Sequence, residues 1–459
     1  MAIEYKCPDC GGLLWFKTDI SNYKEKFAKI KKNTSFWDFH FALPQMKKEF
    51  FITLGEGGTP CRESNRIGKH LELHHLFFKD ETHNPTNSFK DRAAALLISH
   101  ARSWNFQKVI CASNGNQGAS IAAYTSIEGM ECINIIPSDI EIGKKAQLIA
   151  YNSKIITEGN TIDDAINLAL APKYGKDYYQ CTPEFNPLTI EAQKTIAFEI
   201  FEEIGVPDWV IIPVGNGGCL VSIWKGFSEL KESDFIENLP KLVGVQSEVC
   251  APIVEEFLHK KVETFVEHDI LQSKARSIMV KKPLYHSTAI RAINESKGTA
   301  IALTENLMLS SLGDLARYEG IFAEPASALT IGVLTTLIQH HKMKQDDNVV
   351  CLITGSGLKA PYVLEALSSK AKTAGMGGIL STKLKILSQI SISDKKGIHG
   401  TKLKDIIGSV SLPAIYQHLK ELESKKLIYR KKEGKKVIYF ITEEGKKVLD
   451  AMDVLITLL

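Results

Sequence analysis

The chain has 459 residues, of which 44% are hydrophobic and 24% charged, proportions that are ordinary for a soluble globular protein of about three domains. No stretch approaches the ~20 consecutive apolar residues that a membrane-spanning helix needs, and residues 1–6 are too polar for a signal peptide, so we expect a cytoplasmic protein without membrane contact. The nine cysteines fit that compartment: Cys111, Cys132, Cys219 and Cys351 lie among apolar neighbours, and we predict no disulfides.

The net charge of +3 is unevenly distributed along the chain. Residues 378–459 carry 16 Lys and Arg against 9 Asp and Glu, which gives this segment a net charge of +7 and leaves −4 for the rest. A basic tail on a mildly acidic body indicates two functions. We therefore divide the chain into an N-terminal segment (1–49), a body (50–367), a linker rich in Ser, Ala, Lys and Gly (368–378) and a C-terminal domain (379–459).

The N-terminal segment carries a Cys-x-x-Cys pair, Cys7 and Cys10, followed by two glycines. Such a pair is half of a zinc knuckle, because a tetrahedral structural site needs four ligands. Cys61 and His40 are candidate additional ligands at irregular spacing. Two interpretations stay open, a bound structural zinc and a hairpin with two free thiols.

Residues 84–92, Asn-Pro-Thr-Asn-Ser-Phe-Lys-Asp-Arg, predict a turn followed by the start of a helix. Proline disfavours a helical residue before it, Ser88 is the expected N-cap, and Asp91 lies in the first turn, where the helix dipole favours a carboxylate. Lys90 then lies in the partly positive field of the helix N-terminus, which favours its neutral amine. A neutral amine forms a Schiff base with an aldehyde cofactor, whereas the ordinary alternative is a solvated lysine.

From residue 54 onward, apolar runs alternate with helical patterns. After a glycine-rich turn at 54–60, the expected strands are 76–79, 108–112, 132–137, 154–157, 209–214, 241–246 and 348–353. The expected helices among them are 119–126, 144–151, 163–170 and 191–204, and the polar, aperiodic residues 260–283 predict an exposed excursion. This alternation predicts an α/β fold whose parallel sheets are built from βαβ units and covered by helices on both faces.

Three loops rich in Gly, Asn, Ser or Thr follow apolar strands, at 113–117, 215–219 and 354–357. Because ligands bind off the carboxyl ends of strands in an open parallel sheet, we expect these loops to converge on one cleft. The Gly-Asn-Gly-Gly run at 215–218 suits a phosphate, since bare backbone amides approach its oxygens closely and a helix dipole adds attraction. Any one such loop is also ordinary turn chemistry.

A lysine, a phosphate cup and a hydroxyl in one α/β cleft fit pyridoxal 5'-phosphate. Lys90 would hold the aldehyde carbon, Asn116 would hydrogen-bond the phenolic oxygen, and Thr354 would meet the pyridine nitrogen. The phosphate would lie in a cradle formed by Gly215, Asn216, Gly217, Gly218 and Cys219. A hydroxyl at the ring nitrogen, unlike a carboxylate, does not hold the ring protonated, which favours elimination and replacement at the β or γ carbon.

Residues 1–367 resemble the threonine synthase family, in the tryptophan-synthase-β group of fold-type II pyridoxal phosphate enzymes. The segments that carry the resemblance are 54–60, 84–92, 113–116, 214–218, 324–328 and 354–359. It implies a two-lobed body of open parallel sheets, Lys90 as the catalytic lysine and proton shuttle, and the cofactor roles given above. It also implies a substrate loop that holds the amino-acid carboxylate through Ser113, Asn114 and Gln117.

The substrate half departs from the family pattern. Gln117 stands in place of a threonine, and one of the two cysteine pairs typical of archaeal relatives is present. Thr189 stands where threonine synthases typically carry an arginine that pairs with the phosphate of O-phosphohomoserine, and a hydroxyl cannot replace a bidentate guanidinium. Lys144 and Arg92 are candidates for the missing charge, although Arg92 is also a candidate partner of Asp91 or of the sheet edge.

The C-terminal domain resembles a winged helix-turn-helix domain. Its expected elements are helices at 379–390, 400–407 and 414–426, a basic hairpin at 427–440 and a closing helix at 442–459. The resemblance implies major-groove contacts by Ser411, Tyr416, Gln417 and Lys420, and phosphate contacts by Lys431, Lys432, Lys435 and Lys436. The alternative is a protein–protein module with solvated lysines, and the apolar residues 455–459 suit the seam of a homodimer.

The leading hypothesis is a pyridoxal phosphate-dependent carbon–oxygen lyase that converts O-phospho-L-homoserine and water to L-threonine and phosphate, in amino-acid biosynthesis. Thr189 motivates a second hypothesis, a β-elimination or β-replacement on a serine- or phosphoserine-like amino acid. The basic tail motivates a third, a DNA-binding regulator that uses the cofactor fold as an amino-acid sensor.

Overall fold

The computed structural model describes residues 5–10, 12–30, 35–113, 115–138, 140, 142–175, 177–183, 185–262, 273–340, 343–360, 383, 386–391, 393, 397–407, 412–433 and 436–449. The chain divides into two compact units, Met1–Val363 and Leu364–Leu459. The predicted linker at 368–378 lies outside the described residues. None of the helices in these ranges is long and apolar enough to cross a membrane.

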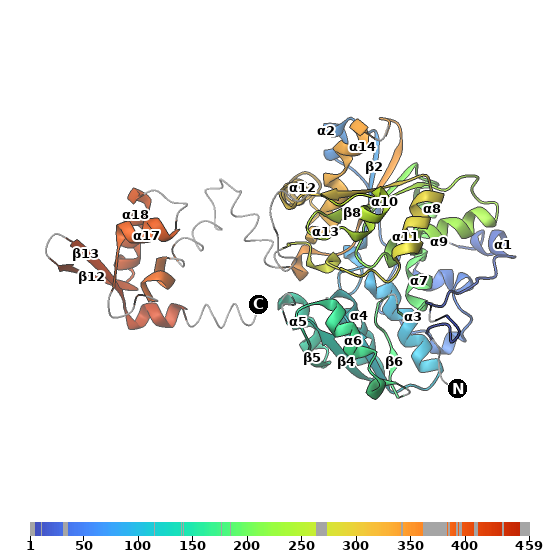
Figure 1. Cartoon of the computed structure of the whole chain (residues 1–459), viewed down its shortest axis with the longest axis horizontal. Coiled ribbons are helices and arrows are strands. Elements are labelled where there is room, and N and C mark those ends of the chain that lie inside the picture. The colour runs from blue at the N-terminus through green and yellow to red at the C-terminus, as the bar shows by residue number, and fades with distance from the viewer. Residues whose placement is uncertain are drawn as a thin grey trace. The chain divides into compact units, whose positions relative to one another are not determined.

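The first unit contains two open sheets that form its two lobes (Figure 1). The larger sheet has the strand order β1 (Cys61–Glu63), β2 (His75–Asp80), β10 (Asn348–Ile353), β7 (Trp209–Pro213), β8 (Lys241–Ser247) and β9 (Thr299–Leu303). All of its neighbouring strands are parallel except β1, which is antiparallel to β2 at the edge. The parallel α/β architecture predicted from the alternating pattern is confirmed.

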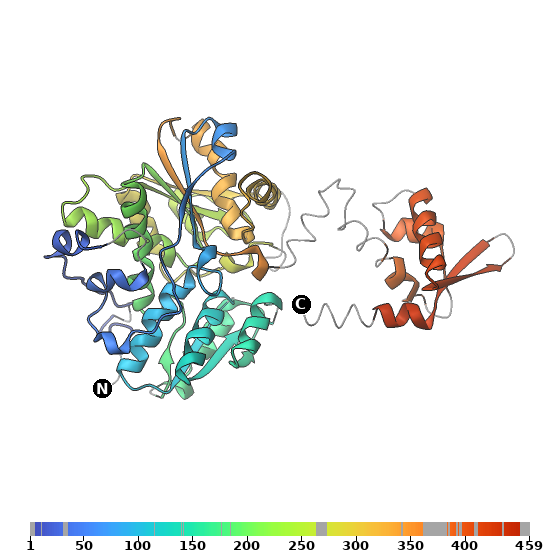
Figure 2. The ribbon, with the colours of Figure 1, turned by 180° about the vertical axis from the view of Figure 1, so that it is seen from behind.

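The smaller sheet is entirely parallel, in the order β5 (Lys154–Thr157), β4 (Glu131–Ile136), β3 (Lys108–Ala112) and β6 (Tyr179–Gln180). All seven predicted strands are present, whereas β1, β6 and β9 lie outside the prediction. Helices pack around both sheets when the unit is seen from front and back (Figures 1 and 2). Such coverage explains why the strands are nearly continuous apolar runs.

The helices of the first unit follow the strands along the chain. They are α1 (Tyr23–Phe27), α2 (Ile67–Leu71), α3 (Lys90–Ser103), α4 (Asn116–Glu128), α5 (Ile142–Ala150), α6 (Ile162–Ala169), α7 (Leu188–Gln193), α8 (Thr195–Ile204), α9 (Gly218–Glu232), α10 (Pro252–Leu258), α11 (His286–Glu295), α12 (Glu305–Asp314), α13 (Pro325–Gly332) and α14 (Leu334–His340). Short 3₁₀ turns lie at 36–42, 48–50, 81–83, 172–174, 276–278 and 357–359, and a π-helical turn at 315–319 continues α12.

Two details of the helix predictions need correction. Ser88 does not cap α3: the residue before the helix is Phe89, no side chain caps it, and the buried Ser88 hydroxyl has no hydrogen-bond partner among the described residues. The single helix expected at 191–204 is divided into α7 and α8 by Lys194. The predicted helical start at Lys90 is confirmed.

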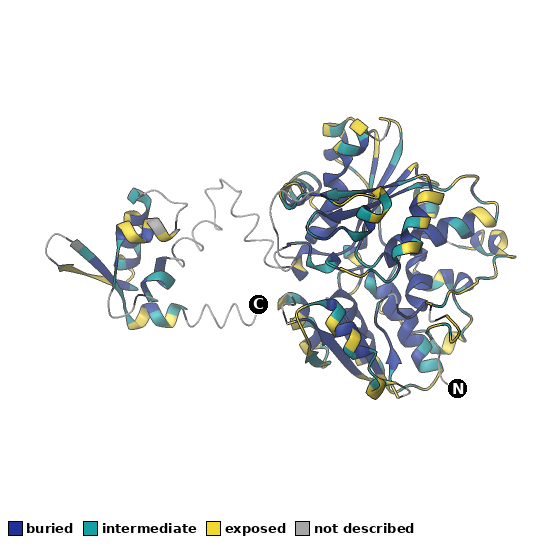
Figure 3. Ribbon diagram, in the orientation of Figure 1, coloured by how far each residue is buried: buried dark blue, intermediate teal, exposed yellow. Residues whose placement is uncertain are grey.

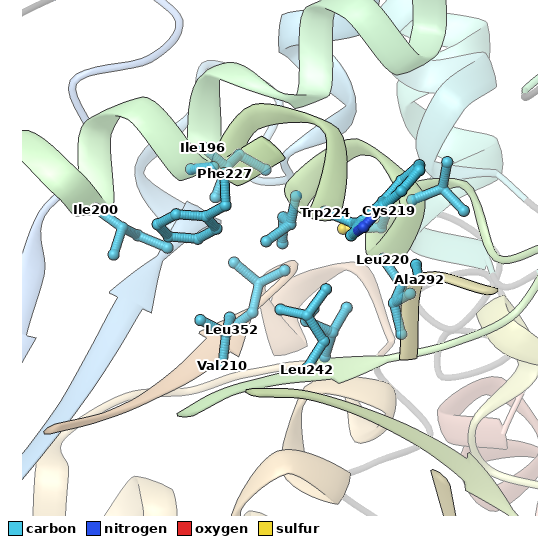
Figure 4. Packing of buried hydrophobic residues seen from close by; sticks show 14 of the residues in the cluster. Ile196, Ile200, Val210, Cys219, Leu220, Trp224, Phe227, Leu242, Ala292 and Leu352 are labelled. Carbon is cyan, nitrogen blue, oxygen red and sulfur yellow. The ribbon is translucent and has the colours of Figure 1, made fainter. Parts of the chain in front are cut away.

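The core of the larger lobe lies between its sheet and helices α8, α9 and α11 (Figure 3). Figure 4 shows Phe227 and Leu220 of α9 above Val210, Leu242 and Leu352 of three adjacent strands. Burial of one such side chain contributes roughly 1.5–3 kcal/mol. This packing fixes the start of α9, and with it the glycine-rich turn that precedes the helix.

The second unit has a three-stranded antiparallel sheet, in the order β11 (Ile398–His399), β13 (Lys436–Ile441) and β12 (Ile428–Glu433), beside α17 (Gly400–Ile407) and α18 (Leu412–Ser424). Ile415, Leu419 and Leu422 of α18 are buried, as the predicted inner face requires. The wing-like hairpin is therefore present, with β11 as an unpredicted third strand. The apolar stretch at 455–459 lies outside the described residues.

Candidate active site

One cavity lies where the two sheets of the first unit present the carboxyl ends of their strands. It holds about 770 Å³ of unfilled space, its opening to solvent included. Its lining is Phe89, Lys90, Ala112, Ser113, Asn116, Gln117, Ile162, Ile166, Pro183, Pro213, Val214, Gly215, Asn216, Gly217, Gly218, Cys219, Ser277, Ile278, Val280, Glu324 and Thr354. The predicted convergence of the loops after β3, β7 and β10 is therefore present, because all three contribute to one wall.

Lys90 reaches this cavity as the first residue of α3. Its Nζ lies 4.7 Å from the centre of the Phe89 ring, which also lines the cavity. Two hydrogen bonds hold the turn at residues 84–87, which precedes Lys90. The backbone N–H of Thr86 donates to the Asp91 carboxylate at 2.6 Å, and Lys359 Nζ donates to the Thr86 carbonyl at 2.6 Å. Burial raises the pKa of Asp91, and Lys359 opposes that shift. The helix start is thus held rigidly by buried polar contacts.

The Gly-Asn-Gly-Gly turn connects β7 to α9. Gly217 has φ +90°, and a Cβ there would lie 3.1 Å from the Tyr285 carbonyl oxygen; a Cβ at Gly215 would lie 3.1 Å from the Ile278 Cα. A side chain at either position would therefore crowd its neighbour, and the positive φ at Gly217 also favours glycine there. The Asn216 side chain accepts the backbone N–H of Leu284 at 3.3 Å, so it ties the turn to the chain segment that follows Ile278. What remains for a ligand is a bare backbone at the N-terminus of a 15-residue helix, which suits an anion.

The loop after β3 ends at the N-terminus of α4. The Ser113 hydroxyl accepts the backbone N–H groups of Gly115 at 2.9 Å and Gly118 at 3.1 Å, so this side chain holds the turn. Gln117 is buried, and neither of its amide atoms has a hydrogen-bond partner among the described residues. A buried amide that faces a cavity without partners is suited to a polar ligand.

Glu324 is a cavity residue without a predicted role. Its buried carboxylate accepts from Asn116 Nδ2 at 3.0 Å and from the Thr354 hydroxyl at 3.2 Å. Thr354 also lies 2.9 Å from the Ser327 hydroxyl. Segment 324–328 is one of those that carry the family resemblance, but the contacts of the Glu324 side chain depend on residues distant in sequence.

Three described residues that were candidates for substrate binding, Lys144, Thr189 and Arg92, lie outside the cavity lining. Lys144 is buried behind the loop after β3, with its Nζ 3.9 Å from Glu324 Oε2, and it is not part of the cavity lining. Thr189 is fully buried in α7, away from the lining, and its hydroxyl has no partner in the described part of the chain. Arg92 is fully buried and pairs with Glu81 and Glu199, so it does not supply a free charge to the cavity. Asn114 lies outside the described residues.

The N-terminal cysteines form a turn closed by a bridge between Lys6 and Leu13. Backbone N–H groups of Cys10 and Asp9 lower the pKa of the Cys7 thiol. Across the described ranges, no group of three or more His, Cys, Asp or Glu side chains is arranged to hold a metal ion. Neither Cys61 nor His40 therefore completes a zinc site with this pair.

The second unit exposes most of its predicted DNA contacts. Tyr416, Gln417 and Lys420 of α18 are exposed, as are Lys431 and Lys432 of β12. The rings of Tyr429 and Phe440 stack at 5.3 Å across the hairpin, and Lys431 Nζ lies 5.5 Å from the Phe440 ring centre. Ser411, Lys435 and the side chain of Lys436 are outside the described residues.

Comparison with protein families gives two matches. The family described as "Pyridoxal-phosphate dependent enzyme" matches residues 52–355, and "HxlR-like helix-turn-helix" matches residues 379–458. The first match contains Lys90, the loops at 113–117 and 215–219, and the first two residues of the loop at 354–357. The second match contains the hairpin and α18.

Three curated relatives of this chain are threonine synthases. The chain is 38% identical to a threonine synthase of Methanocaldococcus jannaschii over 365 residues, which cover 78% of this chain and 89% of the relative. It is 34% identical to that of Methanosarcina acetivorans over 366 residues (79% and 89%) and 36% identical to that of Mycobacterium tuberculosis over 314 residues (68% and 84%).

Solved structures with the same fold are more distant in sequence. Maize serine racemase superposes with a TM-score of 0.58 at 16% identity, covering 77% of this chain and 98% of its own. An L-serine ammonia-lyase from Rhizomucor miehei gives 0.55 at 19% identity, covering 65% and 93%. At this level of identity these likenesses show the fold of the first unit alone.

Proposed function

The chain belongs to the threonine synthase family of pyridoxal phosphate-dependent enzymes, and we propose that it converts O-phospho-L-homoserine and water to L-threonine and inorganic phosphate. The observation that carries this proposal is the single cavity that brings Lys90 together with the glycine turn, Thr354 and the start of α4. Family membership supplies the cofactor and the lyase chemistry; the substrate is our proposal.

The residues of the cavity fit pyridoxal phosphate. Gly215 and Gly217 leave the backbone of this turn accessible to a ligand, because a side chain there would crowd Ile278 or Tyr285. The turn also leads into α9, whose N-terminus attracts a phosphate. Asn116 and Thr354 supply polar groups on the cavity wall for the phenolic oxygen and the ring nitrogen. When bound, pyridoxal phosphate withdraws electrons from the amino acid, which acidifies the α-proton and permits elimination of phosphate from the γ carbon.

Lys90 would hold the cofactor and then act on the substrate. Its Nζ is the basic group placed to remove the proton from the α carbon and to return protons later in the reaction. Its position at a helix start held by buried contacts keeps the amine on one wall of the cavity. That placement is what general acid–base work by one lysine requires.

The start of α4 would bind the amino-acid carboxylate. The helix N-terminus attracts an anion, and the Gln117 amide is buried at that point with unsatisfied hydrogen-bonding groups. Behind the same loop, Lys144 is a cation within reach of the cavity wall, because it already approaches Glu324. We propose that Lys144 contributes to the charge that binds the substrate phosphate, in the absence of an arginine at position 189.

The decisive experiment measures phosphate release and threonine formation from O-phospho-L-homoserine by the purified holoenzyme. The Lys90→Ala variant should lose both activities together with the visible absorbance of bound pyridoxal phosphate, while Lys145→Ala, on an exposed neighbouring lysine, should retain them. Absence of phosphate release at saturating substrate would refute the proposal.

Thr189 keeps a second substrate class in consideration. A β-elimination or β-replacement on serine or phosphoserine needs the same cofactor site. It does not need a second strong binding site for a phosphate, of the kind that an arginine would provide. A panel of phosphorylated and unphosphorylated amino acids separates the two reactions, since release of ammonia and a keto acid from serine or phosphoserine in preference to threonine formation favours the second class.

We also propose that the C-terminal domain binds double-stranded DNA. Supporting observations are the HxlR-like match, the exposed polar face of α18 and the lysines of the hairpin. The proposed partner assembly is a homodimer, because helix-turn-helix proteins commonly read two half-sites of an operator. Gel shifts with the DNA upstream of its own gene, in low and high salt, test the binding, and light scattering tests the dimer.

A regulator without catalysis would bind DNA and an amino acid but release no phosphate. An enzyme with a regulatory domain would bind DNA and also release phosphate from its substrate. The two assays above therefore distinguish the sensor hypothesis from the enzyme hypothesis.

A further inference from the structure

We propose that Glu324 is a positioning residue whose carboxylate fixes the Asn116 amide so that its nitrogen, not its oxygen, is presented to the phenolic oxygen of bound pyridoxal phosphate. The inference rests on the proposed cofactor arrangement and adds to it a residue that had no predicted role. It starts from the contact between Glu324 and Asn116, which are 208 positions apart and share the cavity wall.

The contact determines the orientation of the amide. Asn116 Nδ2 lies 3.0 Å from Glu324 Oε2 and 3.3 Å from Oε1. An ionised carboxylate only accepts hydrogen bonds, so the amide atom that faces it must be the nitrogen. The flipped orientation would put two acceptors at this distance and would be repulsive.

The carboxylate itself is held in place from several directions. It also accepts the Thr354 hydroxyl at 3.2 Å, and Lys144 Nζ lies 3.9 Å from Oε2, which provides a counter-charge. A Cβ at Gly355 would lie 2.9 Å from Glu324 Oε1, so only glycine leaves room for the carboxylate there. The Glu324 backbone N–H donates to the Gly355 carbonyl at 2.9 Å. These contacts give the carboxylate one defined position.

An amide nitrogen carries two N–H groups, and Glu324 engages one of them. The second is left for the phenolic oxygen of the cofactor. Donation to that oxygen stabilises its anionic form and therefore favours the long-wavelength absorbance band of the bound cofactor over the short-wavelength band. Without Glu324, the amide is free to turn its oxygen inward, where it repels a phenolate.

The test measures the two absorbance bands of the resting holoenzyme between pH 6 and 9, with no substrate present. Asn116→Ala should lower the ratio of long- to short-wavelength absorbance across this pH range. Glu324→Ala should shift the ratio in the same direction, and the double variant should show no further shift than Asn116→Ala. Glu324→Gln should restore much of the ratio, because its side-chain oxygen still accepts from Asn116.

Two further variants keep the outcome interpretable. Gly355→Ala displaces the carboxylate without removing it and should reproduce the shift of Glu324→Ala. Glu319→Gln alters another buried carboxylate, which accepts the Ile67 backbone N–H at 2.7 Å, and should leave the bands unchanged. If Asn116→Ala shifts the bands but Glu324→Ala and Gly355→Ala do not, the positioning role is refuted. If Asn116→Ala has no effect, the cofactor arrangement itself is wrong.

Discussion

Arg92 holds Glu199 across 107 residues of sequence. Its Nη2 lies 2.7 Å from Glu199 Oε2, and its Nη1 pairs with the other carboxylate oxygen. The same guanidinium donates twice to Glu81, at 2.8 Å each. All three side chains are almost completely buried, and Arg92 lies two positions beyond Lys90 on α3. Arg92 therefore anchors the helix that begins at Lys90.

Loss of this anchor should destabilise the first unit. Arg92→Ala leaves two buried carboxylates without their main cation, which costs about 3–5 kcal/mol of the free energy of unfolding. Arg102→Ala breaks a half-exposed pair with Glu128 and should cost less than about 1 kcal/mol. Urea denaturation of both variants gives the comparison. A similar small loss in both variants would contradict the anchoring role.

The same ion pair should govern stability in acid. Burial alone raises the pKa of Glu199, but Arg92 and Lys79 outweigh burial and lower it to about 2. A depressed folded-state pKa contributes stability that is complete above the unfolded-state value near 4.5 and is lost as the pH falls toward 2. The loss should therefore be concentrated between these two values.

Glu199→Gln should flatten this acid dependence. One fewer proton is then taken up on unfolding, which reduces the slope of unfolding free energy against pH by up to about 1.4 kcal/mol per pH unit in that window. Denaturation curves at several pH values above 2.5 measure the slope over the range in which both proteins fold. Glu295→Gln, at an exposed pair with Arg291, should leave the slope unchanged.

The sequence was sufficient to predict seven strands of the first unit and the meeting of the loops, for a physical reason. Parallel strands place their carboxyl ends at one edge, so loops at 113–117 and 215–219 must face a shared space once the alternation is recognised. The start of α3 at Lys90 followed from local turn chemistry, although Ser88 does not cap it. These predictions depend on neighbours in sequence.

The remaining features depend on partners that are distant in sequence. The pairing of Arg92 with Glu199 and the contact of Glu324 with Asn116 join elements that only the folded chain brings together. The burial of Thr189 away from the cavity is of the same kind, because position 189 alone does not reveal which face of α7 meets the site. Which helix residues lie away from the cavity, as Thr189 does, was accordingly harder to predict than which loops line it.

The glycine turn yields a prediction about cofactor affinity. Gly217→Ala introduces a Cβ 3.1 Å from the Tyr285 carbonyl oxygen, at a residue with φ +90°. The backbone of the Gly-Asn-Gly-Gly turn must therefore shift. We expect weaker binding of pyridoxal phosphate by about 1–3 kcal/mol, the usual cost of such backbone strain. Fluorescence titration of the apoprotein measures it. Gly205→Ala, at φ +77° with open space around it, carries similar strain outside the cavity and should leave cofactor affinity intact.

Thr189 offers a test of its own substrate role. Thr189→Val keeps the shape of the side chain and removes a buried hydroxyl that has no partner among the described residues. We expect stability to rise by about 1 kcal/mol, since an unsatisfied buried polar group is costly. KM for O-phospho-L-homoserine should not change, because the residue lies outside the cavity lining. A raised KM would instead place the hydroxyl on the substrate.

The hairpin lysines give a prediction about DNA. Lys431 and Lys432 are exposed on β12, where a wing would lie along the phosphate backbone. Each phosphate contact adds about 0.9 to the slope of log affinity against log salt concentration, so the double change to alanine should reduce that slope by up to about 1.8. Lys29→Ala, which removes an exposed lysine of the first unit, should leave the slope unaltered. Fluorescence anisotropy with a labelled duplex at four salt concentrations measures the slopes. Equal slopes for wild type and the double variant would mean that the hairpin does not contact phosphates, and the exposed face would then be assigned to a protein partner.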